Sequence, residues 1–190
     1  TRRGVRSQRL ARWRQGMGFL SEDRKEEGLA TGLSIADNMT LSRLEGLGPG
    51  PFVVSSTQEQ AARTWMDRLA VRAYGPRQRI GELSGGNQQK VAMARLLHHD
   101  VDVYVLDGPT RGIDVGSKAQ IYELIDSLVS ESHSNRPRAV LMVSSYVPEL
   151  LGLCDRVAVM CRGTLGAPMP VAGLDEHAIM LAATGAGDAA

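Results

Sequence analysis

The sequence has no apolar run long enough to cross a bilayer, only two cysteines and almost no excess of either charge sign. Its apolar runs, such as 139–143, fall far short of the roughly 20 residues that a spanning helix needs. No basic segment followed by an apolar stretch opens the chain, so we expect no secretory signal. Cys154 and Cys161 form no disulfide framework, and we expect both to be reduced core residues of a cytosolic protein. We therefore expect a chain that is not itself transmembrane.

Charge also argues against a nucleic-acid partner. The 22 basic and 21 acidic residues give a net charge of +1, which creates no overall field for nucleic acid or anionic lipid. Six arginines in the first fourteen residues could contact phosphates. In a chain with 19 arginines and three lysines, an exposed arginine-rich segment is the simpler interpretation. His98 and His99 could suggest a metal, but consecutive histidines at a helix end project apart and suit the helix dipole.

The length and the alternation of patterns predict one α/β domain. With 190 residues, of which 43% are hydrophobic, the chain is long enough for a real core. The chain begins at Thr1, and we expect it to be a piece of a longer protein. Strands that alternate with helices favour a parallel sheet. We predict strands at 17–20, from 103, at 139–144 and at 156–160; a surface loop at 21–28; and helices from Ser34 to about 46, from about 57, from Ser84, at 115–130, at 148–153 and at 174–183.

Two neighbouring patterns point to phosphate and magnesium chemistry. Ser84, Gly85 and Gly86 stand at the start of a predicted helix, where a phosphate finds backbone N–H donors and no obstructing side chain. Taken alone, these three residues are also consistent with a glycine-rich turn. The apolar strand from Val103 ends at Asp107, at the sheet edge where ligands gather in α/β folds. The alternative for Asp107 is a cap for the following turn.

The stretch Leu-Ser-Gly-Gly-Asn-Gln-Gln-Lys at 83–90 resembles the signature loop of the ATP-binding cassette (ABC) ATPases of membrane transporters. Asp107 is similar to the last residue of their Walker B strand, and 109–114 to the segment leading into their D-loop. The segments 22–29, 111–116, 144–149 and 183–185 resemble the second cassette of ribose, galactose and xylose importers. The resemblance covers about 16–185.

The resemblance implies a P-loop NTPase-like ABC nucleotide-binding domain that is partial, because the phosphate-loop strand and the front subdomain are missing. It divides the chain into a helical signature subdomain at about 30–100, core strands and helices at 101–170, and a C-terminal helix and tail at 171–190. It also implies that Asp114 faces a partner cassette in the D-loop, and that Asp107 holds Mg²⁺ only if a phosphate loop is supplied. The residues that would bind nucleotide in trans are Ser84, Gly85, Gly86, Asn87 and Gln88.

Several positions depart from the family pattern. Gly108 stands where the general base is expected, and a positioned base is worth roughly 10²- to 10⁴-fold in rate. Ser145 occupies the position of the switch histidine, and Glu22 that of the Q-loop glutamine. No Gly-x-x-x-x-Gly-Lys-Ser/Thr motif occurs anywhere in the sequence. We expect no catalytic residue in this chain, and no activity of the chain alone.

The expected function is that of an ATP-binding subunit fragment of a carbohydrate ABC importer, peripheral on the cytoplasmic side of the cell membrane. Its signature loop would act in trans on a second cassette that has an intact phosphate loop, beside permease membrane subunits. ATP and Mg²⁺ are expected in the assembled transporter, and no cofactor in the isolated chain. The alternative is a non-catalytic scaffold or dimerisation remnant, or a truncated gene product.

Overall fold

The computed structural model describes residues 11–13, 15–130 and 137–185. The chain divides into two compact units, residues 1–143 and 144–190, and each is described by itself. Within the described ranges, no helix combines the length and apolar character that a membrane crossing requires.

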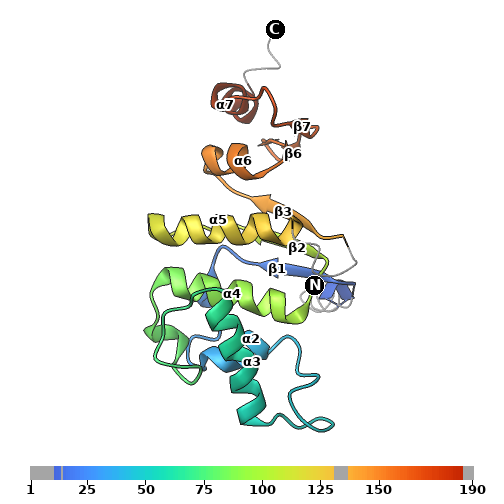
Figure 1. Cartoon of the computed structure of the whole chain (residues 1–190). Coiled ribbons are helices and arrows are strands. Elements are labelled where there is room, and N and C mark those ends of the chain that lie inside the picture. Colours follow the sequence, from blue (N-terminus) through green and yellow to red (C-terminus); the bar gives the residue numbers. More distant parts are fainter. Residues whose placement is uncertain (1–10, 14, 131–136, 186–190) are drawn as a thin grey trace. The chain divides into compact units, whose positions relative to one another are not determined.

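The first unit is built on a three-stranded parallel sheet (Figure 1). Its order is β1 (Met17–Leu20), β2 (Val103–Asp107), β3 (Ala139–Val143). The register aligns Leu20 with Leu106 and Leu106 with Met142. The predicted parallel α/β arrangement is therefore confirmed, with the first strand at the predicted residues.

Two long helices, α4 (Gly85–His99) and α5 (Val115–Ser130), cover one face of this sheet (Figure 1). Leu20, Tyr104 and Leu106 are fully buried on that face. Gly18 lies on the same face, and a Cβ there would be 3.0 Å from Leu96 Cδ2 of α4. Glycine in β1 therefore allows the helix to approach the sheet closely.

The opposite face of the sheet is apolar and largely uncovered, and we call it the open face. Successive strand residues point to opposite sides, so Phe19 on β1 aligns with Val105 on β2 and with Leu141 on β3. Phe19 is 44% exposed, Leu141 59% and Val143 51%. Parallel sheets normally have both faces covered. The open face consists of Met17, Phe19, Val103, Val105, Ala139, Leu141 and Val143.

A helical group packs against α4 on its other side. It comprises α2 (Ile35–Thr40), α3 (Ser55–Arg68) and the 3₁₀ turn η2 (Ile80–Glu82). Ser34 and Asp37 form a reciprocal capping box that starts α2, which confirms the predicted N-cap. The prediction that this helix continues to about 46 is wrong. The chain leaves the helix after Thr40 because the Ser42 hydroxyl donates to the Arg95 carbonyl at 3.2 Å and holds the segment against α4.

Three further predictions of the first unit need correction. The charged segment expected to be only a loop contains a π-helical turn, η1 (Arg24–Gly28), because Asp23 Oδ1 accepts from the N–H groups of Lys25 and Glu26 at 3.1 Å. Trp65 and Tyr122 lie at apolar positions of helical patterns, which predict core residues. Both are only half-buried, and the Trp65 indole N–H donates to His98 Nδ1.

The second unit is a small mixed arrangement. Its helices are α6 (Val147–Leu153) and α7 (Glu176–Thr184), close to their predicted bounds. The single strand predicted at 156–160 is wrong, because its two ends pair with different segments. β4 (Arg156–Val157) pairs with β7 (Met169–Pro170), and β5 (Met160–Cys161) with β6 (Thr164–Leu165), all antiparallel. The two cysteines are free thiols as predicted, but half-buried, not core.

His98 makes the packing of the helical group sensitive to pH. Its Nε2–H donates to the Arg43 carbonyl at 2.9 Å and its Nδ1 accepts from Trp65, so the ring is neutral in this arrangement. Burial lowers the pKa of His98 below its ordinary 6.5, and the positive charges of Arg43 and His99 act in the same direction, whereas the bond to the Arg43 carbonyl opposes them.

We therefore expect the chain to lose stability as the pH falls from about 7.5 to about 5.5. Below 6.5 the unfolded chain takes up a proton at His98 more readily than the folded chain, so unfolding becomes more favourable. Thermal unfolding of the wild type and of His98→Gln at both pH values measures this effect. Glutamine can donate to one partner and accept from the other, so the variant should show a smaller fall. An equal fall in both proteins would assign the effect to other groups.

Candidate functional site

The N-terminus of α4 carries hydrogen-bond donors that find no acceptor among the residues described. Ser84 is the N-cap, as predicted, and its Oγ accepts from the Asn87 N–H at 3.4 Å. The Gln88 N–H donates to the Ser84 carbonyl at 2.9 Å. First-turn amides have no intrahelical acceptor, and in the described part of the chain none is found for the N–H groups of Gly85 and Gly86. We call the Ser84 hydroxyl and these two N–H groups the donor trio.

The two glycines are required by close packing within the chain. A Cβ at Gly85 would lie 2.9 Å from Arg24 Nη2 and 3.2 Å from the Gly112 carbonyl oxygen. A Cβ at Gly86 would collide with the Ser117 side chain, whose Cβ would be 2.6 Å away, and would lie 3.5 Å from Asp114 Oδ2. Glycine therefore lets α4 begin directly against the segment 111–117.

The side chains of Asn87 and Gln88 are directed into the chain. Asn87 Oδ1 accepts from the Arg72 N–H at 2.8 Å. Gln88 is 5% exposed, and its Nε2 donates to the Ile80 and Leu83 carbonyls at 3.2 and 3.1 Å. Both side chains therefore stabilise the segments that precede α4. The sequence pattern grouped them with the phosphate-binding residues because it contains no information on their distant partners.

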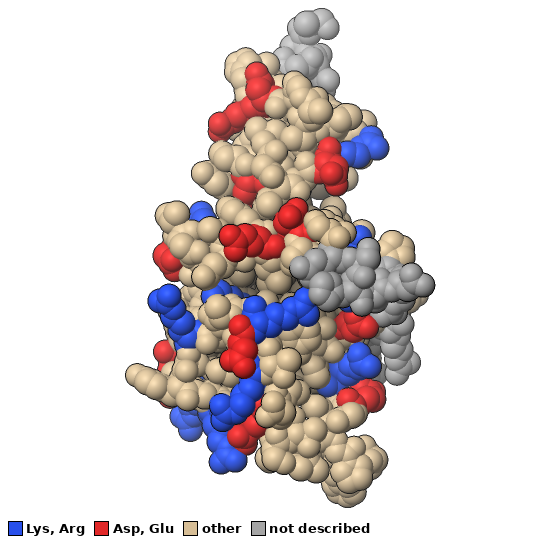
Figure 2. Space-filling model, viewed as in Figure 1, with Lys and Arg blue, Asp and Glu red and all other residues tan. Residues whose placement is uncertain are grey.

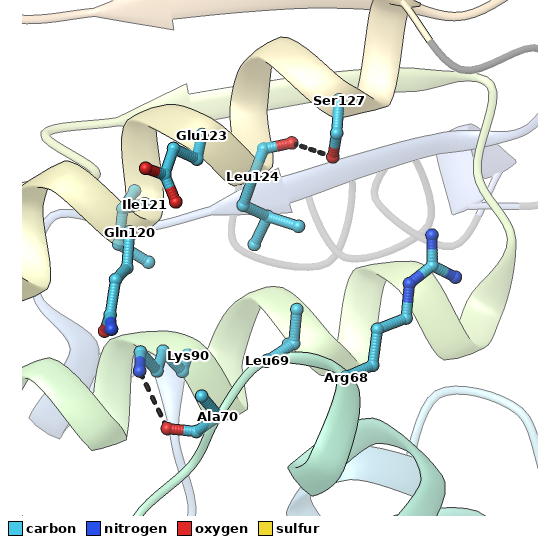
Figure 3. A pocket seen from close by; sticks show the side chains of 9 residues that line it. All are labelled: Arg68, Leu69, Ala70, Lys90, Gln120, Ile121, Glu123, Leu124 and Ser127. Carbon is cyan, nitrogen blue, oxygen red and sulfur yellow. Dashed lines mark hydrogen bonds between the residues drawn. The ribbon is translucent and has the colours of Figure 1, made fainter.

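Lys90, the last residue of the signature stretch, has a structural role that the sequence did not indicate (Figure 3). It is 5% exposed, and its Nζ donates to the Ala70 carbonyl at 2.8 Å. Ala70 has a φ of 47°, which is rare for a residue with a side chain. Burial lowers the pKa of Lys90, Arg72 adds to this, and Asp114 opposes it. The bond stabilises the turn after α3, beside a pocket of about 330 Å³ between α3, α4 and α5.

The structure brings Glu22, Gly108 and Arg111 together at the carboxyl ends of β1 and β2. Glu22 and Arg111 form an ion pair. Gly108 has a φ of 53°, and a Cβ there would lie 3.4 Å from Glu22 Cγ and 3.5 Å from Arg111 Cβ. Both distances are ordinary van der Waals contacts, so a Cβ at 108 would touch these two residues without a collision, and the positive φ is what favours glycine here. This association between the predicted Q-loop and base positions was not visible in the sequence.

Asp107 is the candidate Mg²⁺ ligand in the described part of the chain. Asp107 ends β2 and is half-buried. Among the residues that the structure describes, no three His, Cys, Asp or Glu side chains gather to hold a metal ion. His98 and His99 are bonded to the carbonyls of Arg43 and Ser42 instead. Nucleotide-bound Mg²⁺ is usually held by one or two carboxylates together with substrate phosphates, so Asp107 could serve as a ligand only beside a bound nucleotide.

Asp114 and Ser145 lie in turns stabilised by serines. Asp114 is exposed and accepts from the Ser117 N–H at 2.9 Å and the Ser117 hydroxyl at 2.7 Å; these bonds lower its pKa. The Asp114 carboxylate therefore stabilises the start of α5. Ser145 is exposed in the second unit, between Ser144, whose hydroxyl bonds to buried Glu149, and Tyr146.

Charged side chains of both signs are interspersed on the face shown in Figure 2. Of the six arginines near the start of the chain, five lie outside the described residues and only Arg12 lies within them. The expectation of no nucleic-acid partner stays a prediction.

Comparison with known proteins places these features in context. Residues 2–111 match the family described as ABC transporter. The ribose import ATP-binding protein of Geobacillus kaustophilus is 40% identical over 181 residues, which are 95% of this chain and 35% of that protein. An arabinose import ATP-binding protein of Burkholderia cenocepacia is 42% identical over 169 residues, 88% of this chain and 33% of that protein. The chain thus spans about one third of the length of the curated relatives it matches.

The fold has a solved counterpart. A dimeric ATP-binding cassette in a post-hydrolysis state, with bound ADP and Pi, superimposes with a TM-score of 0.69 at 21% identity, covering 86% of this chain and 67% of that chain. The predicted fold class, a partial cassette of mixed α/β structure, is confirmed.

Proposed function

Because this chain belongs to the ABC transporter family, we propose that it is part of the ATP-binding subunit of a carbohydrate importer and supplies its signature loop to ATP held by a partner cassette. The observation that carries the proposal is the donor trio at the start of α4. The relatives named for ribose and arabinose import support the substrate class.

The donor trio is suited to an anionic phosphate oxygen. Gly85 and Gly86 supply two N–H groups at the positive end of a 15-residue helix, and the exposed Ser84 can add its hydroxyl. The side chains of Asn87 and Gln88 face the chain itself, so we restrict the proposed nucleotide contacts to Ser84, Gly85 and Gly86. An anion supplied by a partner cassette would meet these donors at the start of α4.

The nucleotide site on this chain's own side is proposed to be inactive. Gly108 offers no base, and the Glu22–Arg111 ion pair lies next to it. Asp107 would contribute to Mg²⁺ binding only beside a phosphate loop from elsewhere, and Asp114 would face the partner cassette. Hydrolysis would take place on the partner's side.

The proposed assembly contains a second cassette with an intact phosphate loop and permease membrane subunits, with this chain peripheral on the cytoplasmic side. ATP and Mg²⁺ would be bound in the assembled transporter and not by the isolated chain. The division into a signature subdomain at 30–100, a core at 101–170 and a tail at 171–190 belongs to the same proposal. The rival function is a scaffold that only dimerises.

The proposal predicts that substitution of Asp107 affects the ATPase rate much less than substitution of the equivalent aspartate in the partner cassette. In the assembled transporter, Asp107→Asn should change the ATPase rate by no more than about twofold, because the site it serves lacks its base. The same substitution at the equivalent aspartate of the partner cassette should cost about 10²-fold or more. ATPase rate and sugar uptake of the two variants, measured side by side, test this. Equal losses from both variants would show that this chain's own site turns over ATP.

A further inference from the structure

Arg24 joins three segments that are distant in the sequence. It lies in η1, after β1, and its Nη1 donates to the Arg111 carbonyl at 2.8 Å while its Nη2 donates to the Gly112 carbonyl at 3.3 Å. The same Nη2 lies 2.9 Å from the place where Gly85 would carry a Cβ. The guanidinium group therefore contacts the segment after β2 and the start of α4 at once.

Two glycines make room for this guanidinium group. Gly112 has a φ of 67°, and a Cβ there would lie 3.6 Å from Arg24 Nη2. A side chain at Gly85 would come closer still. Both positions that flank the Arg24 guanidinium group thus lack side chains. The group can therefore donate to the main-chain carbonyls after β2 on one side and contact the start of α4 on the other.

The third nitrogen of the Arg24 guanidinium group, Nε, indicates that stability alone does not account for this arrangement. This nitrogen is buried and has no hydrogen-bond partner among the described residues. A buried donor without an acceptor costs free energy, and such groups in folded proteins call for an explanation. The positive charge is also retained directly beside Gly85, where the donor trio would meet an anion.

We propose that Arg24 is a positioning residue that fixes the donor trio against the segment 111–117. Through Arg24, the loop after β1 then determines the affinity of the signature loop for a phosphate. This inference rests on the proposed function and extends it to a residue that does not touch the nucleotide. A change in the position of η1 would move the Arg24 guanidinium group. The carbonyls of Arg111 and Gly112, and with them the contact at Gly85, would lose their fixed geometry.

The test uses the assembled transporter with Arg24→Ala, Arg24→Lys and the neighbouring Lys25→Ala. Lys25 is exposed, and within the described part of the chain its side chain has no hydrogen-bond or ion-pair partner, so it controls for charge. Arg24→Ala should raise the KM for ATP about tenfold or more, because two hydrogen bonds to a charged group are lost. Arg24→Lys should be intermediate, because an ammonium group cannot form the two-pronged contact. Lys25→Ala should match the wild type.

The split between KM and Vmax separates positioning from simple folding. If Arg24 only stabilises the fold, Arg24→Ala lowers Vmax in proportion to the lost folded protein and leaves KM unchanged, and the proposal is overturned. Ser84→Asp is measured in parallel. If Ser84→Asp abolishes ATPase activity but Arg24→Ala behaves like the wild type, this inference fails and the proposed function stands. If Ser84→Asp has no effect, the proposed function itself fails.

Discussion

Replacement of Ser84 by Asp should abolish ATP hydrolysis by the assembled transporter, whereas replacement by Asn should preserve much of it. Ser, Asp and Asn are comparable N-caps, so both variants should keep α4 intact. Asp places a carboxylate where the phosphate oxygen is proposed to lie, in a closed site where like charges are poorly screened. The loss should be about 100-fold or more, comparable to the removal of a donor that contacts developing charge. Initial rates of phosphate release at saturating ATP measure it.

The Asp and Asn pair at Ser84 is a sharper test than a change at Gly86. A carboxylate at 86 would collide with Ser117 and approach Asp114 within the chain itself, so a loss of activity would have two explanations. Circular dichroism of both Ser84 variants should match the wild type. Unchanged ATPase activity in Ser84→Asp would favour the scaffold function and leave the signature loop without a role.

Replacement of Leu141 by Glu should reduce self-association of the isolated chain at least tenfold. Leu141 lies on the open face in the outer strand β3, beside Val105 of the central strand, and is 59% exposed. An apolar sheet face promotes association with another chain, and so does a strand edge such as that of β3, for which the described ranges contain no second partner strand. Burial of one leucine contributes about 1.5–3 kcal/mol, which corresponds to about tenfold or more in an association constant. Sedimentation velocity across a concentration series measures the change.

Phe52→Glu is the matched control for this prediction. Phe52 is 73% exposed, but it lies in the connection between α2 and α3, away from the sheet strands. Its replacement removes comparable apolar surface and adds the same charge, so association should change little. We also expect the isolated wild-type chain to be only marginally stable. A monomeric wild type with a sharp cooperative melt at ordinary temperature would contradict both expectations.

The elements that were predicted well are those with strong local patterns. The apolar run at 17–20 and the helix at 115–130 have the predicted bounds, and Ser84 caps α4. Periodicity and capping chemistry act over a few residues, so they are readable in one sequence. The resemblance of 83–90 to the signature loop led to the family that the comparisons show.

The features that were missed depend on residues far apart in the chain. The end of α2 is set by contacts of Ser42 with α4, more than fifty residues away. The inward direction of Gln88 and the bond from Lys90 to Ala70 could not be read from the motif, because the same letters suit a ligand or a loop partner. Contacts of this kind follow from packing, which a local pattern does not encode.

The backbone at Gly108 has a consequence for the evolution of this chain. A single codon change to Glu would restore the expected acidic residue but not a relaxed backbone on which it could act. Any side chain at a φ of 53° costs about 1–2 kcal/mol, and here it would also enter the space beside the Glu22–Arg111 ion pair. If Gly108 occupies the base position, as proposed, the turn itself therefore opposes a return to glutamate by a single substitution.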